Sequence, residues 1–186
     1  MDAKSQLRET SAEQALPQLL PGRQQVLSIT RFLPAAPATV YALWTDASQL
    51  LHWYAPKDFA VALCEGDTAV GSRWRIVLRR DAEQAFTVQR QFLQVEPARR
   101  LVYMEQCLYG DSYTNTDSEL DSGQGAGSSH VFYDAMTQVT FEKLANKTKL
   151  TVRAEPQNHY SEADIAEWLR GCNALLDRLN AALRQR

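Results

Sequence analysis

The sequence predicts a single α+β domain in which a curved antiparallel sheet of about seven strands surrounds a long C-terminal helix. Three observations support this prediction. Strand-like stretches follow one another between residues 59 and 154, mostly with short turns between them, and strands joined by short turns run antiparallel. Two short helical segments follow the first strand. The chain ends in an amphipathic helix, whose apolar side needs a sheet face to cover.

Length and charge narrow the classes of protein to consider. With 186 residues, 45% of them hydrophobic, the chain can bury the core of one domain. We assign residues 25–186 to that domain and residues 1–24 to a flexible N-terminal extension. A formal net charge of −2 gives no attraction to nucleic acid or to an anionic membrane. No apolar run approaches the roughly 20 residues that cross a bilayer, so we expect no membrane insertion.

The N-terminus and the cysteines indicate a cytoplasmic protein. The first residues lack the basic and apolar regions of a secretory signal. Cys64, Cys107 and Cys172 are odd in number, lie far apart and form no CxxC pair, which argues against a disulfide framework and against a zinc site. We interpret them as buried thiols in a reducing compartment.

The domain is predicted to begin with a strand and a short helix. Residues 25–33 alternate in the manner of a strand. Pro34 and Pro37 then end the strand pairing, and Pro37 also suits the first turn of a helix over Ala38–Thr45. The first strand therefore leads directly into a helix.

A second helix is predicted after Asp46, whose side chain can cap it. Leu51 and Trp53 would lie on its apolar side, and Pro56 would end it. Trp53 and Tyr54 would then lie near the helix end, where the mouth of a cavity is expected. Both side chains combine an apolar body with one polar atom, which suits such a place.

Six further strands follow the two helices. Residues 73–80 show the pattern most clearly, because Trp74, Ile76 and Leu78 alternate with arginines, as in a sheet with one face in water. The predicted strands are residues 59–65, 73–80, 85–95, 100–108, 135–143 and 148–154.

Residues 110–130 differ from the strands on either side. This stretch is rich in Gly, Ser, Thr and Asp and contains four acids but no Lys or Arg. It cannot bury much surface, so we predict a long acidic Gly/Ser loop. One hypothesis makes this loop a lid over the cavity mouth.

The C-terminal helix is the clearest element in the sequence. Ser161 can cap it, with Asp164 three residues later. Gly171 lies inside the helix, where glycine costs about 1 kcal/mol relative to alanine, and close approach to a strand is one explanation for it. The apolar stripe is formed by Ile165, Trp168, Leu169, Cys172, Leu175, Leu176, Leu179 and Leu183.

Several stretches together resemble a known family. ITRFLPAAPATVYALWTDASQLLHWYAP carries an order of strand, proline, Val-aromatic, Trp-Thr-Asp and Trp-aromatic-x-Pro, and VGSRWRIVL, FLQVEPARRLVY, VTFEKL, TKLTVR and WLRGCNALLDRL support it. The chain resembles the START-like helix-grip (SRPBCC) superfamily over roughly Val26 to Leu183. More narrowly, it is similar to homologues of the activator of heat-shock-protein-ninety ATPase, C-terminal-domain-like. The N-terminal extension and the long acidic loop depart from the family pattern.

The resemblance implies a helix-grip fold with a cavity between the sheet and the C-terminal helix, but it does not imply one chemistry. We expect a small, mostly hydrophobic molecule to bind in that cavity. Two alternatives stay open. One is a co-chaperone-like interaction module that stimulates a chaperone ATPase. The other is a cyclase- or hydrolase-type enzyme that uses the same cavity, with Glu105 and Tyr103 as its acid–base pair.

Arg90 breaks the apolar pattern of its strand. It shares strand parity with Phe86 and Phe92, so regular alternation places its guanidinium on the apolar face, where a buried charge needs a partner. Glu105, which shares parity with Tyr103, is one candidate, and a carboxylate or phosphate of a ligand is another. Alternatively, a bulge shifts the alternation, or Arg90 extends to the rim of the sheet.

The predicted binding site combines aromatic contact area with one polar pair. Inward-facing positions were assigned from strand parity and from the helix stripe, and Arg90 with Glu105 would orient a polar end of the ligand. His52, His130 and His159 form no metal-binding spacing, so we predict no metal. The sequence shows no Ser-His-Asp pattern, glycine-rich phosphate loop or lone reactive thiol, so we name no catalytic residue. We predict no cofactor, and a homodimer stays open. The predicted ligand-binding residues are Trp53, Tyr54, Trp74, Arg90, Tyr103, Glu105 and Trp168.

Overall fold

A computed structural model describes residues 26–82, 84–109 and 131–185 of the chain. The predictions for the N-terminal extension, residues 1–24, and for the acidic loop and lid, residues 110–130, lie outside the described residues.

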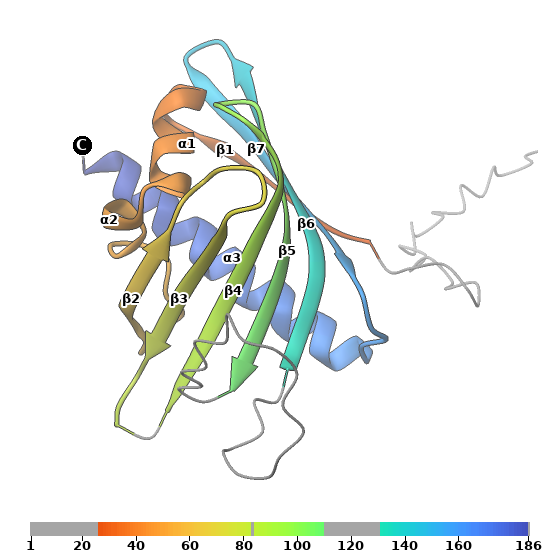
Figure 1. Cartoon of the computed structure of the whole chain (residues 1–186). Helices are drawn as coiled ribbons and strands as arrows, with labels where there is room; N and C mark the ends of the chain where they lie inside the picture. The colour runs from red at the N-terminus through yellow and green to blue at the C-terminus, as the bar shows by residue number, and fades with distance from the viewer. Residues whose placement is uncertain (1–25, 83, 110–130, 186) are drawn as a thin grey trace, which may run out of the picture.

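The described chain forms one antiparallel sheet of seven strands with three helices (Figure 1). The strands follow the order β1-β7-β6-β5-β4-β3-β2, so the predicted α+β architecture is confirmed. The elements are β1 (Leu27–Leu33), α1 (Pro37–Thr45), α2 (Ala47–Leu50), β2 (Ala60–Gly66), β3 (Arg73–Arg79), β4 (Ala85–Glu96), β5 (Arg100–Tyr109), β6 (Val131–Leu144), β7 (Lys147–Pro156) and α3 (Glu162–Arg184).

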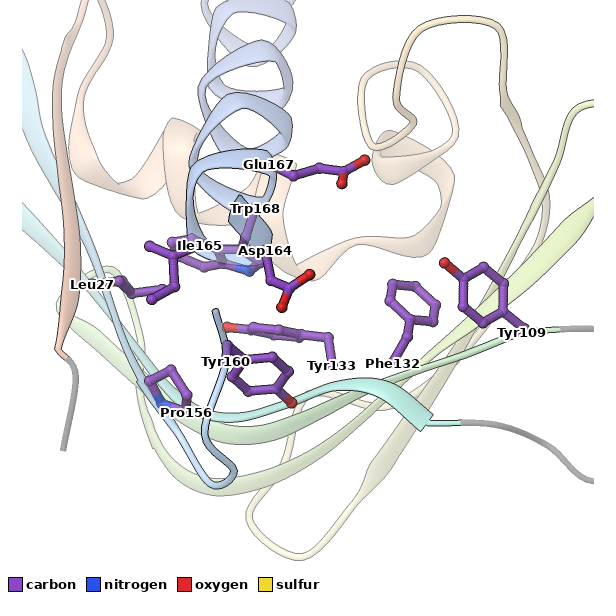
Figure 2. A pocket seen from close by; sticks show the side chains of 10 residues that line it. All are labelled: Leu27, Tyr109, Phe132, Tyr133, Pro156, Tyr160, Asp164, Ile165, Glu167 and Trp168. Carbon is purple, nitrogen blue, oxygen red and sulfur yellow. The ribbon is translucent and has the colours of Figure 1, made fainter. Parts of the chain in front are cut away.

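The long helix α3 covers one face of the sheet. Figure 1 shows α3 running diagonally across the strands, and Figure 2 shows the sheet curving around it. Leu176, Leu179 and Leu183 of α3 are buried in the main core, because the stripe at helical spacing gives this helix one continuous apolar side. Near the C-terminal end of α3, the helix α1 contacts β6 and β7. The helix-grip arrangement is therefore present.

Both predicted helix caps are present. At the start of α2, the Ser48 backbone N–H donates to Asp46 Oδ1 at 2.8 Å. At the start of α3, the Asp164 N–H donates to Ser161 Oγ at 3.2 Å, and the Ser161 N–H donates to Asp164 Oδ2 at 3.0 Å. This reciprocal capping box satisfies two backbone donors and fixes where α3 begins.

The second helix is shorter than predicted. α2 has only four residues, and Leu51 is 49% exposed rather than part of an apolar side. Trp53, Tyr54 and Ala55 are buried one after another, and three consecutive residues cannot all point to one side of a helix. The Trp53 indole N–H donates to the Leu43 carbonyl at 3.0 Å. The predicted place of Trp53 and Tyr54 at a cavity mouth is wrong, because the side chains are 1% and 6% exposed.

Gly171 has a different setting from the one predicted. A Cβ atom built at Gly171 meets no atom of the described residues within 4 Å, so close approach to a strand does not explain the glycine. None of the helices that the structure describes has the length and apolar character needed to span a membrane.

Candidate functional site

Two spaces lie between the sheet and α3. The larger, which we call the open-end pocket, has a volume of about 220 Å³ and lies where β5 ends and β6 begins (Figure 2). The smaller, which we call the inner void, has a volume of about 40 Å³. Two wider hollows, one between α2 and the last turns of α3 and one over the β4–β5 turn, are more open to solvent. The open-end pocket is lined by Leu27, Tyr109, Phe132, Tyr133, Pro156, Tyr160, Asp164, Ile165, Glu167 and Trp168.

A β-bulge builds the aromatic floor of the open-end pocket. Cys107 of β5 pairs with Tyr133 of β6, but the next residue, Leu108, pairs with Val131. Phe132 is therefore the extra residue of a bulge, which re-aims a side chain that regular alternation would turn to the other face. As a result, the adjacent residues Phe132 and Tyr133 both line the pocket.

Aromatic side chains pack against one another along this pocket. The Tyr133 ring stacks on the Trp168 ring of α3, with centroids 5.6 Å apart and an interplanar angle of 23°. The Tyr160 ring centroid lies 5.9 Å from that of Tyr133. On the other side, the Tyr109 and Phe132 centroids are 4.3 Å apart. Five rings, two from β6 and one each from β5, from the segment before α3 and from α3 itself, thus surround one space (Figure 2).

Polar atoms of this pocket differ in how they are satisfied. The Tyr160 hydroxyl accepts the Asp134 backbone N–H at 2.8 Å. In contrast, the Tyr133 hydroxyl is buried and has no hydrogen-bond partner within the described part of the chain, although Tyr133 is only 6% exposed. Burial raises the pKa of Tyr133 well above its usual range, so the group remains a neutral hydroxyl that can donate and accept.

The inner void lies beside a buried ion pair. Arg90 Nε donates to Glu105 Oε2 at 2.7 Å, and Arg90 Nη2 donates to the Tyr54 hydroxyl at 2.6 Å. The guanidinium carbon also lies 4.6 Å from the Tyr54 ring centroid and 4.8 Å from that of Tyr103. Arg90 is 3% exposed and Glu105 is 9% exposed. The guanidinium is thus held between two rings and a carboxylate.

The regular alternation of inward- and outward-facing side chains in β4, which predicted this pair, is unbroken up to Arg90. The bulge of β4 falls later, at Leu93, between the paired residues Phe92 and Gln94. Arg90 is therefore directly opposite Glu105 in the sheet register. Of the alternatives for Arg90, burial with Glu105 as partner is confirmed.

Burial and neighbouring groups act in opposite directions on Arg90. Burial alone would lower its pKa, but Tyr103, Tyr54 and Glu105 together outweigh that effect and hold the pKa of Arg90 well above its ordinary value. Burial also raises the pKa of the Cys172 thiol, which lines the inner void. Arg90 therefore stays charged and Cys172 stays a neutral thiol at physiological pH.

The structure separates the predicted site residues into three groups. Trp168 lines both the open-end pocket and the inner void. Trp74 and Tyr103 line neither space and pack against Phe92, with ring centroids 6.3 Å and 5.6 Å away. Of the alternative acid–base pair, Glu105 lines the inner void, where it binds Arg90, whereas Tyr103 does not line it. The predicted residues that line only the inner void are Trp53, Tyr54, Arg90 and Glu105.

Sequence reasoning missed most of the open-end pocket. The strand β6 begins at Val131 rather than at the predicted residue 135, so Phe132 and Tyr133 fell between the predicted loop and the predicted strand. The available signal was the FYD triplet itself, because aromatic residues are enriched in strands. Tyr160, just before the Ser161 cap, carried no pattern that distinguishes a pocket residue from a loop residue.

Comparisons with known proteins agree with this fold. Solved structures of proteins from three bacteria align with it. The protein from Arthrobacter aurescens has a TM-score of 0.68 at 17% identity, covering 87% of this chain and 87% of that chain. The protein from Rhizobium leguminosarum has a TM-score of 0.66 at 19% identity, covering 88% of this chain and 97% of that chain. The protein from Chromobacterium violaceum has a TM-score of 0.61 at 20% identity, covering 85% of this chain and 96% of that chain. At these identities the likeness shows the fold alone.

The search of curated proteins gave no match. Residues 34–184 match the family described as Activator of Hsp90 ATPase homolog 1-like protein. This match includes β2 to β7, all three helices and every residue that lines the two spaces described above, apart from Leu27. The chain therefore belongs to the Activator of Hsp90 ATPase homolog 1-like family.

Proposed function

We propose that the protein binds a small, mostly hydrophobic molecule in the open-end pocket, between the curved sheet and α3. The observation that carries the proposal is the aromatic lining of a space of about 220 Å³. Ligand sites are concave and mostly apolar, with a few polar groups that fix orientation. Burial of apolar surface, at roughly 25 cal/mol per Å², would drive binding.

The size of the two spaces favours the open-end pocket over the inner void. A volume of about 40 Å³ holds on the order of one water molecule. A volume of about 220 Å³ is close to the lower end of known ligand sites, roughly 300 Å³. The ligand is therefore small, and the Arg90–Glu105 pair faces it only if Trp168 moves.

A pocket-filling variant tests this proposal. Ile165 lines the pocket from α3, so Ile165→Trp places an indole in the space that a ligand would occupy. N-phenyl-1-naphthylamine, a neutral apolar fluorophore, serves as the probe. We expect saturable binding to the wild-type protein and an affinity roughly tenfold weaker, or about 1.4 kcal/mol, in Ile165→Trp.

Ala166→Trp is the matched control. Ala166 is the next residue of α3, is exposed and does not line the pocket, so the same side chain added there should leave probe affinity unchanged. Absence of saturable binding to the wild-type protein, or equal effects of the two variants, would overturn the proposal. Native mass spectrometry of freshly purified protein would show whether a small molecule copurifies.

Binding to a chaperone remains the alternative that the family description suggests. The two functions predict different consequences for Ile165→Trp, because this change fills a pocket and leaves most of the outer surface intact. A chaperone-binding module would keep its partner affinity in this variant, whereas a ligand-binding protein loses affinity for its ligand.

A further inference from the structure

We propose that the ligand of the open-end pocket carries a positive charge, as a protonated amine or a quaternary ammonium group. In this proposal the carboxylates of Glu167 and Asp164 attract the charge, and aromatic rings of the pocket contact it. The inference rests on the proposed function, because it assigns a ligand class to the same pocket.

The charge of the pocket lining has one sign. Among the residues that the structure describes, the lining contains Asp164 and Glu167 but no Lys, Arg or His. Figure 2 shows both carboxylates on the α3 side, above the aromatic rings of the sheet. A ligand with a carboxylate or phosphate would meet two negative charges here without a counter-charge from the lining, whereas a cation is attracted by both.

Neither the Glu167 nor the Asp164 carboxylate has all its oxygens hydrogen-bonded to the described residues. Glu167 makes no hydrogen bond or ion pair with the described residues. Asp164 accepts two hydrogen bonds from Ser161, both at Oδ2, and its Oδ1 accepts none from the part of the chain that the structure describes. These bonds to Ser161 lower the pKa of Asp164. One free carboxylate and one free carboxylate oxygen thus border the pocket.

The aromatic residues add a second attraction for a cation. A cation over the face of Trp, Tyr or Phe is attracted by the electron-rich ring, and sites that hold quaternary ammonium groups are built from several such rings. The rings of Tyr133 and Trp168 stack, and those of Tyr109 and Phe132 lie 4.3 Å apart, so their outer edges and faces border the same space. Acids beside aromatic faces provide a combination that an uncharged apolar ligand does not need.

The Tyr133 hydroxyl provides an independent indication of a missing polar partner. Tyr133 is 6% exposed and lines the pocket, yet its hydroxyl has no partner among the described residues. Buried hydroxyl groups normally form a hydrogen bond. An N–H of a protonated amine would supply one, with the Tyr133 oxygen as acceptor, whereas a quaternary ammonium group has no N–H and would be held by charge and ring contacts alone.

The start of α3 does not cancel this negative charge. The N-terminus of a helix carries roughly half a positive charge. The first residues of α3 include Glu162, Asp164 and Glu167, so the formal charge around the helix start remains clearly negative. The local field therefore favours a cationic ligand.

Three probes of equal chain length test the charge preference. Octyltrimethylammonium, octanol and octanoate differ in head-group charge and share the apolar chain, and isothermal titration calorimetry on the full chain gives their affinities. We expect octyltrimethylammonium to bind about tenfold more tightly than octanol, and octanoate to bind most weakly. The preference should decrease in high salt because salt screens exposed charges.

Charge-removing variants locate the effect. Glu167→Gln keeps the shape of a pocket residue and removes its charge, and should weaken octyltrimethylammonium binding by about threefold or more while leaving octanol unchanged. Glu162→Gln is the matched control, because Glu162 has the same charge on the same helix end but does not line the pocket. Its effect on the cation should be smaller than that of Glu167→Gln.

The outcomes separate the two proposals. Octanol binding as tightly as octyltrimethylammonium, or equal effects of Glu167→Gln and Glu162→Gln, overturns the charge preference and leaves ligand binding in place. No binding of any of the three probes overturns both proposals. Tighter binding of octanoate than of the cation would show that the sign of the charge is wrong.

Discussion

Arg90 places a guanidinium in the interior of the protein, and its neighbours compensate for the loss of water. The side chain donates to Glu105 and Tyr54 and lies between the rings of Tyr54 and Tyr103. A buried ion pair of this kind adds little net stability relative to apolar residues of the same size, but removing one member leaves an uncompensated charge. The pair should therefore be sensitive to single substitutions and tolerant of a double one.

This asymmetry gives a prediction at the scale of single residues. Glu105→Ala leaves Arg90 charged and buried, so we expect the free energy of unfolding to fall by about 3–5 kcal/mol. The combined change Arg90→Met with Glu105→Leu should recover most of that loss. Urea unfolding monitored by tryptophan fluorescence measures both. A loss below about 1 kcal/mol in Glu105→Ala would show that water reaches the pair.

Gly171 gives a prediction at the scale of elements. Nothing among the described residues lies within 4 Å of a Cβ built at this position, so the glycine costs helix stability without improving packing. We expect Gly171→Ala to raise the free energy of unfolding by about 1 kcal/mol. Ala174→Gly, at an exposed position one turn later in α3, should lower it by a similar amount. A destabilised Gly171→Ala variant would contradict this view of α3.

Local patterns predicted the elements well where side chains alternate regularly. The alternation of Trp74, Ile76 and Leu78 identified β3, and the stripe of α3 identified its buried side, because one contact surface determines both patterns. The same logic failed at Phe132, where a bulge changes which face the side chain meets. A bulge depends on the pairing of two strands, and the alternation within one strand does not reveal it.

Tertiary contacts also explain why the sequence did not predict where every site residue lies. Trp53 was predicted at a cavity mouth, but its indole bonds to the Leu43 carbonyl in the core. The composition of the segment favoured both places equally, since a tryptophan suits a mouth and a core. The charge pair was predictable because Arg90 and Glu105 share parity on neighbouring strands, whereas the open-end pocket required knowledge of how β6 begins.

For the molecule as a whole, Trp168 is the side chain that divides the space under α3. It lines both the open-end pocket and the inner void and stacks on Tyr133. The two spaces are therefore parts of one interval between sheet and helix, separated by an indole. If the open-end pocket binds a ligand as proposed, we expect this one side chain to limit the ligand's length.

Removing the indole should lengthen the pocket. We expect Trp168→Ala to join the two spaces and to increase the affinity for dodecanol relative to octanol by roughly tenfold, at a loss in unfolding free energy of about 3 kcal/mol. Trp168→Phe keeps a ring at the partition and should preserve the wild-type preference. Fluorescence displacement of N-phenyl-1-naphthylamine gives the affinity ratio. An unchanged ratio in Trp168→Ala would mean that other side chains close the gap.

The buried charges have a further consequence while the sheet assembles. Arg90 and Glu105 are brought opposite each other by the β4–β5 hairpin. If one strand slipped by a single residue, one of the two charges would turn to the opposite face, and a slip of two residues would place Arg90 against Tyr103 or Cys107. Either misalignment buries a charge without its counterpart, which costs several kcal/mol. We infer that this pair selects against wrongly aligned hairpins, a discrimination that interchangeable aliphatic side chains would not supply.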